Sequence, residues 1–496
     1  MRNILVFMML MFSTVVISAQ SKNILLDADF WKKNPDVAAV KAEIIKGNDP
    51  AELNANAFDP VVLAINNSAP NATILYLLEQ KGNPVYKITH DSRIYLHWAA
   101  YKGNTELMEF LLAKGSDINL EDSHGNPPAA FAAGSGQTNT KTYDLLFKQG
   151  ISPKKKYKDG ANLLLLGIQN DKNLALTDYF IGQGLSLTQT DDAGNTAFDY
   201  AARGGNVEQL KILRQKGIPA TGHALFTAAQ GLRRQSNTID VFKYLIEEVK
   251  LDPGSKNKQG ETALHLLVKK QNQLDIINYL ISKGVDPNIA DNNGNTLLMN
   301  AASGAEAAVI EKLISKSKNI NLVNNKGQSA LTYAVSGGSA GSVSLLLNNG
   351  AYANLKDRDG NNLMFYLINS YKSMKPGSPE EQDFDNKLSL LKTSGVEVSA
   401  AQKDGNTLYH LAVMKNGVPL LKKLEIMKPD INSKNNEGLT ALHKAAMMAS
   451  DDTILKYLLS LGADKKLTTE FDETAYDLAS ENEALGRNKI SIEFLK

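Results

Sequence analysis

Apolar residues recur along the chain at helical spacing in short paired segments, and the pattern is clearest from Lys258 to Asn288. Two runs share this spacing: Leu264, Leu267 and Val268, then Leu274, Ile277, Leu280 and Ile281. Polar residues 271–272 separate the runs, so the pattern predicts two helices joined by a turn. Gly260 favours a turn before the first helix, Thr262 is suited to cap it, and Gly284 is suited to end the second helix.

One such helix pair cannot bury its own apolar face, so it needs a copy on each side. The sequence supplies copies at intervals of about 33–35 residues. Their turn positions are Lys22, Ala57, Ser92, Gly125, Gly160, Gly194, Thr221, Gly260, Gly294, Gly327, Gly360, Gly405, Gly438 and Asp472. The pattern therefore predicts a stack of about fourteen units after the first twenty residues, with degenerate units at both ends.

The best-defined units resemble the ankyrin repeat. GETALHLLVKK from Gly260, GNTLYHLAVMK from Gly405 and GLTALHKAAMM from Gly438 are similar to its motif G-x-T-P-L-H-x-A-A. LLAKGSDIN, LISKGVDPN and LLSLGADKK are similar to its closing motif L-L-x-x-G-A-D-x-N. The resemblance implies an all-α ankyrin solenoid with short β-hairpin fingers, in which inner helices and fingers line a concave side. It also implies binding of another protein, without naming the partner.

Two units depart from the period. The unit at Thr221 starts early, with only residues 218–220 after Gly217, which predicts a missing finger and a weak joint near 217–238. Extra residues then fall at Gly231–Thr238, between the helices of that unit. The unit at Gly360 is longer than the others, and its surplus, Ser373–Asp385, is rich in Pro, Gly and acidic residues, which predicts an exposed loop insertion at 373–385.

The first twenty residues have a different composition from the rest. Arg2 is followed by an apolar run from Ile4 to Phe12, and Ser18 and Ala19 form a plausible cleavage site. We interpret residues 1–19 as a signal peptide, cleaved after Ala19, and residues 20–496 as a single solenoid. The alternative, a buried first helix, fits poorly with the polar residues 20–22.

Composition narrows the class of protein further. The chain has 496 residues, a net charge of +1 and no cysteine, so disulfides are excluded and packing alone must hold the fold. The near-neutral charge gives no reason to expect nucleic-acid or membrane binding. Export without cysteine is more typical of a bacterial than an animal ankyrin protein, and we expect a periplasmic or secreted monomer. No cofactor or metal is expected.

Two side-chain series resemble functional sites but have structural interpretations. His97, His265, His410 and His443 share one repeat position, too far apart for a common metal ion. The resemblance implies that this histidine bonds to loop backbone and ties units together. The next position holds aromatic residues in some units, namely Trp98, Phe131, Tyr200, Tyr333 and Tyr366. Because leucine fills it in others, packing between units is favoured over a stacking ladder for bases or sugars.

Two short motifs were weighed in the same way. Ser339 lies in G-x-S-x-G, a hydrolase motif that requires a strand before the serine. Here a helix precedes it, so we expect a turn and no enzyme. Lys154, Lys155, Lys156 and Lys158 lie in one finger, as a solvated run or as a contact for an acidic partner.

The candidate site is the concave face with its finger tips. Its predicted residues are Tyr101, Lys102, Arg203, Lys258, Gln259, Lys269, Lys270, Asn292, Asn293, Lys326, Arg358 and Lys415. Several are cationic, which suggests a mildly basic surface for an acidic partner protein. The alternative is that lysine is simply tolerated at exposed helix ends. Neither Lys269 nor Lys270 is expected to face the stack.

The most favoured function is non-enzymatic protein binding in the bacterial periplasm or outside the cell. One alternative is a helper or antidote for an exported enzyme or toxin, by analogy with other bacterial ankyrin proteins. A second is a structural component of the envelope. An enzyme would need clustered catalytic residues, and the sequence offers none.

Overall fold

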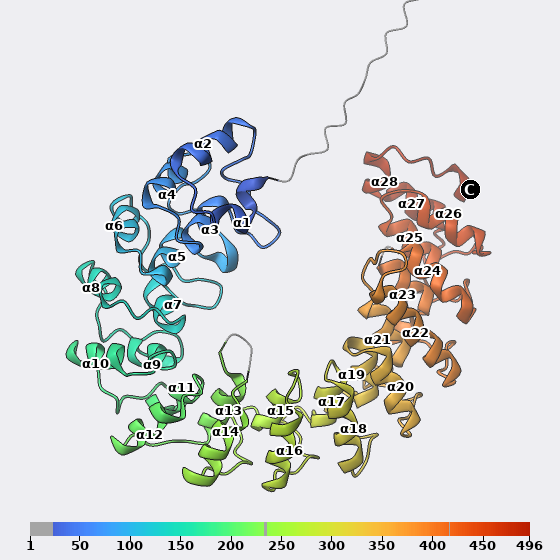
Figure 1. Ribbon diagram of the computed structural model, residues 1–496. Coiled ribbons are helices and arrows are strands. Elements are labelled where there is room, and N and C mark those ends of the chain that lie inside the picture. Colours follow the sequence, from blue (N-terminus) through green and yellow to red (C-terminus); the bar gives the residue numbers. More distant parts are fainter. Residues whose placement is uncertain (1–22, 233–235, 416) are drawn as a thin grey trace, which may run out of the picture. The chain divides into compact units, whose positions relative to one another are not determined.

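A computed structural model describes residues 23–232, 236–415 and 417–496. The described residues form helices α1 to α28, arranged as successive pairs, and each pair corresponds to one unit of the sequence repeat (Figure 1). The predicted all-α solenoid of about fourteen units is therefore confirmed. The predicted leader, Met1–Ala19, lies outside the described residues.

In each pair an inner helix is followed by an outer helix. The inner helices are α1 (Ala28–Trp31), α3 (Pro60–Asn66), α5 (Tyr95–Lys102), α7 (Pro128–Gly134), α9 (Leu163–Ile168), α11 (Ala197–Ala202), α13 (His223–Gln230), α15 (Ala263–Leu267), α17 (Leu297–Ala302), α19 (Ala330–Gly337), α21 (Leu363–Ser370), α23 (Leu408–Met414), α25 (Ala441–Met448) and α27 (Ala475–Glu481). The outer helices are α2 (Val37–Ile45), α4 (Asn71–Leu78), α6 (Thr105–Ala113), α8 (Thr140–Lys148), α10 (Ala175–Gly182), α12 (Val207–Gln215), α14 (Ile239–Lys243), α16 (Leu274–Ser282), α18 (Ala307–Lys316), α20 (Ala340–Asn348), α22 (Pro379–Thr393), α24 (Val418–Leu424), α26 (Thr453–Ser460) and α28 (Glu483–Arg487).

The chain divides into two compact units. The first comprises Met1–Ala201 with Gln215–Ile218, and the second comprises Ala202–Arg214 with Pro219–Lys496. The division falls within the sixth helix pair, α11 and α12. A lower stability of the joint at 217–238 stays a prediction.

Within each unit the inner helices pack against one another in a row. In the first unit α5 packs on α3 and α7, and in the second α19 packs on α17 and α21. Small residues allow this close approach, because the last turn of many inner helices carries a buried alanine pair. Examples are Ala99–Ala100, Ala228–Ala229 and Ala301–Ala302, each at most 1% exposed. The stack thus buries the apolar face that a single pair would leave exposed.

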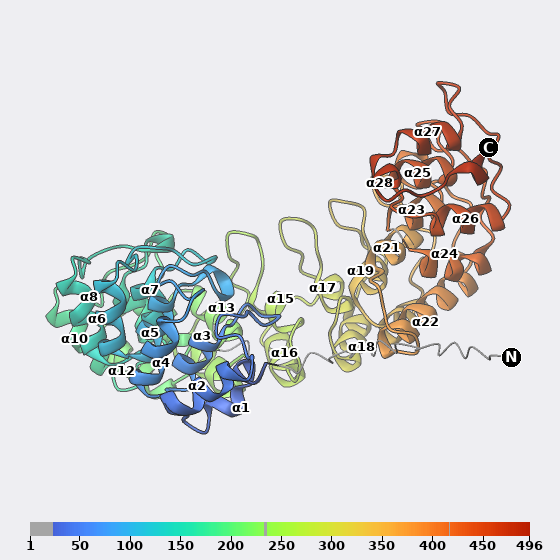
Figure 2. The ribbon, with the colours of Figure 1, turned by 90° about the horizontal axis from the view of Figure 1, so that it is seen from above.

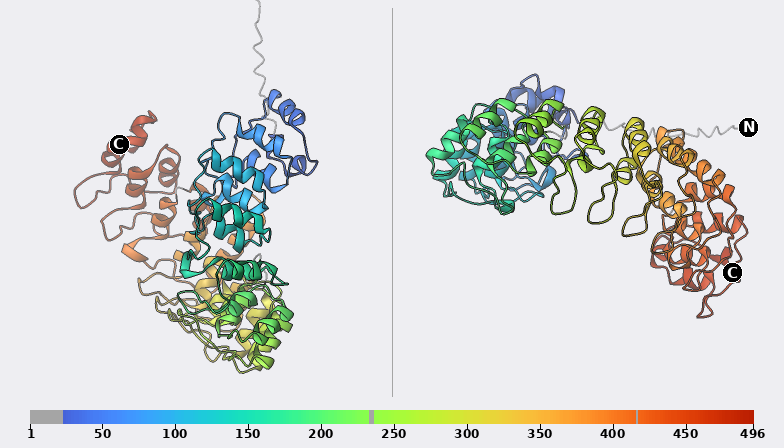
Figure 3. Two further views of the ribbon diagram at one scale, coloured as in Figure 1. Left: turned by 90° about the vertical axis from the view of Figure 1, so that its left-hand side faces the viewer. Right: turned by 90° about the horizontal axis from the view of Figure 1, so that it is seen from below.

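Many fingers between pairs are turns held by an Asp or Asn side chain. Asp291 Oδ1 accepts from the backbone N–H groups of Asn293 and Asn295, both at 2.8 Å. Asn257 and Asn324 make equivalent pairs of bonds in their own fingers. Isolated antiparallel bridges such as Ala290–Thr296 close some fingers. In Figures 2 and 3 the fingers of the second unit that precede α15, α17 and α19 project side by side.

The first departure from the period is as predicted, and the second differs in part. Only residues 216–222 connect α12 to α13, so the finger is missing there. The predicted loop at 373–385 is helical from Pro379 onward, where α22 begins, and only 371–378 form the loop. The Pro, Gly and acidic residues that are typical of a loop also suit the start of a helix. Ser378 caps α22, Pro379 takes its first position, and Glu380 follows.

Two neighbouring repeats of the second unit carry unsatisfied polar groups. His265 Nε2 in α15, Asn278 Oδ1 in α16 and Asn300 Nδ2 in α17 are buried without a hydrogen-bond partner among the described residues. The unit after Gly294 carries Met299 at the histidine position and Asn300 at the aromatic position. Since an unpaired buried polar group costs about 1–3 kcal/mol, these two repeats are weakened.

Candidate functional site

The predicted finger residues of the second unit lie along a hydrogen-bonded ladder. The N–H of Asn292 donates to the carbonyl of Gln259, that of Asn325 to Asn293, and that of Arg358 to Lys326, each at 2.9 Å. Each of these bonds joins neighbouring fingers through backbone atoms alone. The finger tips therefore form a continuous row in which a backbone bond links each finger to the next.

The side chains on this row are solvent-exposed. Lys258, Gln259, Asn293, Lys326 and Arg358 are all exposed, and three of them are cationic. They occupy successive fingers, so their charges follow the direction of the stack. Asn292 is exposed as well, but its Nδ2 donates to the carbonyl of Lys258 at 3.0 Å, so its side chain also supports the ladder.

The predicted residues at the inner-helix ends are divided between the two units. Arg203, Lys269 and Lys270 line a common cavity of about 860 Å³ in the second unit. Lys415, in the same unit, does not line it. Tyr101 and Lys102 belong to the first unit, where the Tyr101 ring lies 5.7 Å from that of Phe131.

The expectation that Lys270 faces away from the stack is wrong. Its Nζ donates to the carbonyls of Ala229 and Gln230, at 2.7 and 2.6 Å, at the end of the preceding inner helix. Such carbonyls have no partner within their own helix and attract cations. Lys102 donates in the same way to Asn66, and Lys415 to Asn369, at 3.1 and 3.0 Å. These lysines therefore join successive units, while Lys269 is exposed.

Three of the four histidines that share one repeat position join neighbouring units by hydrogen bonds. Nδ1 of His410 accepts from the N–H of Thr407 at 3.2 Å, so Nε2 carries the proton and donates to the carbonyl of Leu439 in the next unit at 2.8 Å. His97 and His443 make the same pair of bonds. His265 lacks the second bond. Burial lowers the pKa of all four, and that of His97 to about 4.

The aromatic residues that follow the histidine position also have structural contacts, because their polar atoms bond to finger residues. Trp98 Nε1 donates to Thr89 Oγ1 at 2.9 Å, and Tyr200 OH donates to Asp191 at 3.0 Å, each joining an inner helix to its own finger. Tyr333 OH accepts from Asn324 Nδ2 of its own finger at 3.2 Å and also donates to Asn295 Oδ1 of the preceding finger at 2.8 Å. Their polar ends are thus engaged in the finger bases. This geometry supports packing over a stacking ladder.

The lysine run of the first unit connects fingers. Lys155 Nζ donates to Asn119 Oδ1 at 2.8 Å and Lys158 Nζ to the carbonyl of His124 at 3.1 Å, both in the preceding finger. Lys156 pairs with Asp192 of the following finger at 3.2 Å. Three of the four lysines therefore have partners within the first unit, which neither sequence interpretation anticipated.

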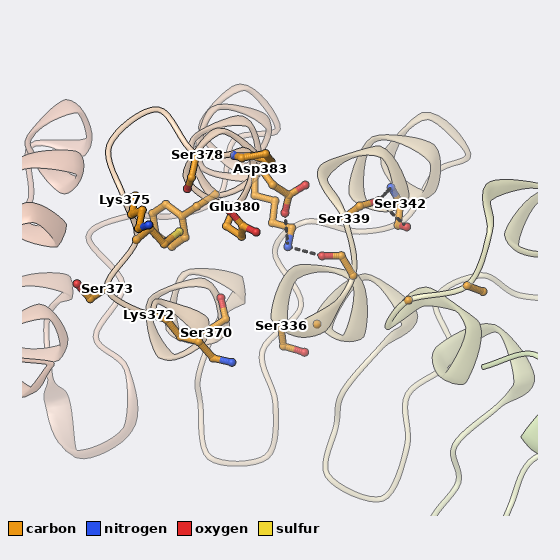
Figure 4. Close-up of a pocket in the computed structure, with 18 residues that line it drawn as sticks. Ser336, Ser339, Ser342, Ser370, Lys372, Ser373, Lys375, Ser378, Glu380 and Asp383 are labelled. Carbon is orange, nitrogen blue, oxygen red and sulfur yellow. Dashed lines mark hydrogen bonds and ion pairs between the residues drawn. The ribbon is translucent and has the colours of Figure 1, made fainter. Parts of the chain in front are cut away.

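Ser339 lies in a second cavity, of about 760 Å³, between α19, α20 and the inserted segment 370–387 (Figure 4). Its Oγ accepts from the N–H of Ser342 at 3.1 Å and so caps α20. The residues that line this cavity include several serines and lysines but no histidine. The serine thus has a structural role in a turn between helices, as expected.

The same cavity shows how the insertion is attached. Lys387, which is 7% exposed, pairs with Asp383 at 2.9 Å and also donates to the carbonyl of Gly338. Asp383 in turn accepts from the N–H of Ala340 at 2.7 Å, at the start of α20 (Figure 4). The extended helix α22 is therefore fixed to the preceding unit by bonds from its Lys387–Asp383 pair to the backbone of Gly338 and Ala340, which the sequence pattern did not reveal.

Comparison with known proteins identifies the family. A family model described as ankyrin repeats (3 copies) matches residues 31–122, 225–322, 298–374 and 382–488. A second, ankyrin repeats (many copies), matches residues 168–214. Together with the helix pairs, fingers and histidine bonds, these matches show that the chain belongs to the ankyrin repeat family.

The relatives are diverse. Palmitoyltransferase AKR1 of Lachancea kluyveri is 29% identical over 214 residues, which is 40% of this chain and 28% of that protein. Transient receptor potential cation channel subfamily A member 1 of Homo sapiens is 29% identical over 220 residues, 42% of this chain and 19% of that protein. A putative ankyrin repeat protein of Rickettsia bellii is 34% identical over 65 residues, 13% of this chain and 36% of that protein. The chain thus matches well under half of each relative's length.

Among solved structures, the ankyrin repeat domain of human ASB11 is 23% identical. The match covers 46% of this chain and 98% of that one, with a TM-score of 0.38. In the described residues, no helix is long and apolar enough to cross a membrane.

Proposed function

We propose that this protein binds another protein, without catalysis, through the finger row of its second unit. The observation that carries this proposal is the ladder itself, which holds successive finger tips by backbone bonds and leaves their side chains exposed. A preorganised surface loses little conformational entropy on binding. The cationic residues Lys258, Lys326 and Arg358 favour a partner with an acidic surface.

We further propose that the protein acts after export, in the bacterial periplasm or outside the cell, as a monomer. The leader pattern of residues 1–19 and the absence of cysteine support this placement. Mass spectrometry of the mature protein is expected to find an N-terminus at Gln20. An intact Met1 would exclude processing.

Charge reversal of the finger row tests the binding site. The triple variant Lys258→Glu, Lys326→Glu, Arg358→Glu is expected to weaken capture of the native partner about tenfold or more and to reduce its salt dependence. The ladder should survive, because its bonds use backbone atoms. The matched control is Lys243→Glu, Lys316→Glu, Lys392→Glu, which makes the same charge change at exposed positions of outer helices.

Affinity purification from the native envelope supplies the partner for this test. An exported enzyme or toxin would support the helper or antidote alternative. The lack of any stoichiometric soluble partner would support the structural alternative and contradict our proposal. Equal capture by the triple variant and the wild type would place the binding surface elsewhere.

A further inference from the structure

The cavity of about 860 Å³ in the second unit combines residues from three successive repeats. Arg203 follows α11, Gly231 and Ser236 lie between α13 and α14, and Lys270 lies between α15 and α16. Its lining residues are Arg203, Gln230, Gly231, Ser236, Leu266, Lys269, Lys270, Gln271, Asn272 and Gln273. The volume is within the range of ligand pockets.

Among the described residues, the lining is cationic and carries no carboxylate. Arg203, Lys269 and Lys270 are its charged residues, and the others are polar amides, a serine, a glycine and one leucine. An acidic side chain touches the lining from outside, since Glu306 Oε1 accepts from the N–H of Asn272 at 2.8 Å. Its Oε1 is thus engaged with the backbone.

Two of the cations are held together by the end of one helix. Lys270 Nζ donates to the carbonyls of Ala229 and Gln230, and Arg203 Nε donates to that of Gly231 at 2.9 Å. Burial lowers the pKa of Lys270, and the charge of Arg203 lowers it further. The fold therefore maintains a pair of like charges that repel each other, a feature often found at binding sites.

Lys269 adds a third positive charge to the cavity, and its side chain is exposed to solvent, whereas its neighbour Lys270 is half-buried in the stack. An anion placed in the cavity would relieve the repulsion between Arg203 and Lys270 and would also reach Lys269. A single phosphate would fill little of this volume, whereas two or three carboxylate side chains on one segment would match the three cations.

We propose that this cavity binds an acidic segment of the protein partner, with its Asp or Glu carboxylates placed against Arg203, Lys269 and Lys270. The inference rests on the proposed function, because it assigns the chemistry of one part of the partner. The remaining contact would be made by the finger row.

A labelled octaglutamate peptide tests the cavity directly, by fluorescence anisotropy with the full-length protein at low ionic strength. Lys269→Glu is expected to weaken peptide binding about tenfold or more, because it replaces an attraction with a repulsion. Lys269 is the residue of choice since Arg203 and Lys270 also bond to the backbone. Lys316→Glu, an exposed outer-helix position with the same charge change, is expected to alter the affinity less than twofold.

Three results would overturn the inference. The first is no binding of octaglutamate by the wild-type protein. The second is equal weakening by Lys269→Glu and Lys316→Glu, which would indicate non-specific attraction. The third is Lys269-dependent binding of inorganic pyrophosphate without binding of the peptide, which would assign the cavity to a small anion. If any of these occurs while the finger-row variant still loses the native partner, the proposed function stands and this inference alone fails.

Discussion

At the scale of residues, adjacent lysines in this protein have different roles. Lys269 and Lys270 are neighbours in sequence, yet only Lys270 donates to the preceding inner helix. Helical spacing could not distinguish the roles of these two lysines, because both follow the last apolar residue of α15. The difference depends on which side chain reaches the carbonyls of Ala229 and Gln230, and that requires the neighbouring unit to be in place.

The two lysines give a matched pair of variants. Lys270→Glu is expected to destabilise the contact between α13 and α15 by about 1–3 kcal/mol, because it leaves two carbonyls unpaired and places a negative charge at a helix C-terminus. Lys269→Glu is expected to change stability by less than about 0.5 kcal/mol, as exposed substitutions usually do. Hydrogen exchange of the α13 amides measures the change in stability that each variant causes. Equal protection in the two variants would contradict the bonding role of Lys270.

The buried histidines predict a loss of stability in mild acid. The pKa of His97 falls from 6.5 to about 4 on folding, so between these values the unfolded chain binds more protons than the folded one. The stabilisation is complete above pH 6.5 and declines as the pH falls toward 4, by about 2–3 kcal/mol. His265, His410 and His443 act in the same direction.

Urea denaturation followed by tryptophan fluorescence measures this effect. Both tryptophans, Trp31 and Trp98, lie in the first unit with His97, so the signal reports on that unit. The midpoint is expected to be lower at pH 4.5 than at pH 7.5. His97→Gln should be less stable at pH 7.5 but should show a smaller change between the two conditions. The same change in the variant and the wild type would exclude His97 as the cause.

At the scale of elements, the junction between α19 and α20 depends on a glycine. A Cβ at Gly338 would overlap the carbonyl oxygen of Ala302 and lie 3.0 Å from that of Ala334. Its φ of −85° is open to any residue, so only this close approach requires glycine. Gly341, three residues later in α20, would meet only Ser339 Oγ, at 3.5 Å.

Alanine at these two positions is expected to have opposite effects. Gly338→Ala should destabilise the second unit by about 1–3 kcal/mol through overpacking. Gly341→Ala should stabilise it by about 0.5 kcal/mol, because it reduces the freedom of the unfolded chain at a helical position. Thermal denaturation followed by circular dichroism compares the two. Similar midpoints would mean that the backbone at Gly338 relaxes without cost.

Much of the fold could be predicted from the sequence, because the motifs around Gly260, Gly405 and Gly438 repeat at a fixed period. The short spacing of residues after Gly217 was enough to predict the missing finger there. Local composition gave the wrong prediction at Pro379, because the acidic residues that begin α22 are equally typical of a loop. The site was harder to predict, since the cavity joins Arg203 to Lys270 across three repeats, and the ladder uses backbone atoms that leave no mark in the residue pattern.

At the scale of the whole molecule, stability is approximately a sum over neighbouring repeats, so irregular segments are expected to be the most exposed to a protease. Limited proteolysis should cut first at residues 217–221, in 231–238, or in 371–378. Residues 379–385 should be protected, because they lie in α22. Cleavage within 379–385, or uniform resistance of all these segments, would contradict this assignment.

The unpaired atoms of His265, Asn278 and Asn300 have a mechanical consequence. When a stack of repeats is pulled from its two ends, every interface carries the same tension, and the one with the weakest bonding separates first. In the second unit, we expect the repeats that carry these atoms, the pairs α15–α16 and α17–α18, to be among the first to separate. Extension under load would then include an early separation inside this unit, with the helix pairs farther along the stack still folded and able to close again when the force is released.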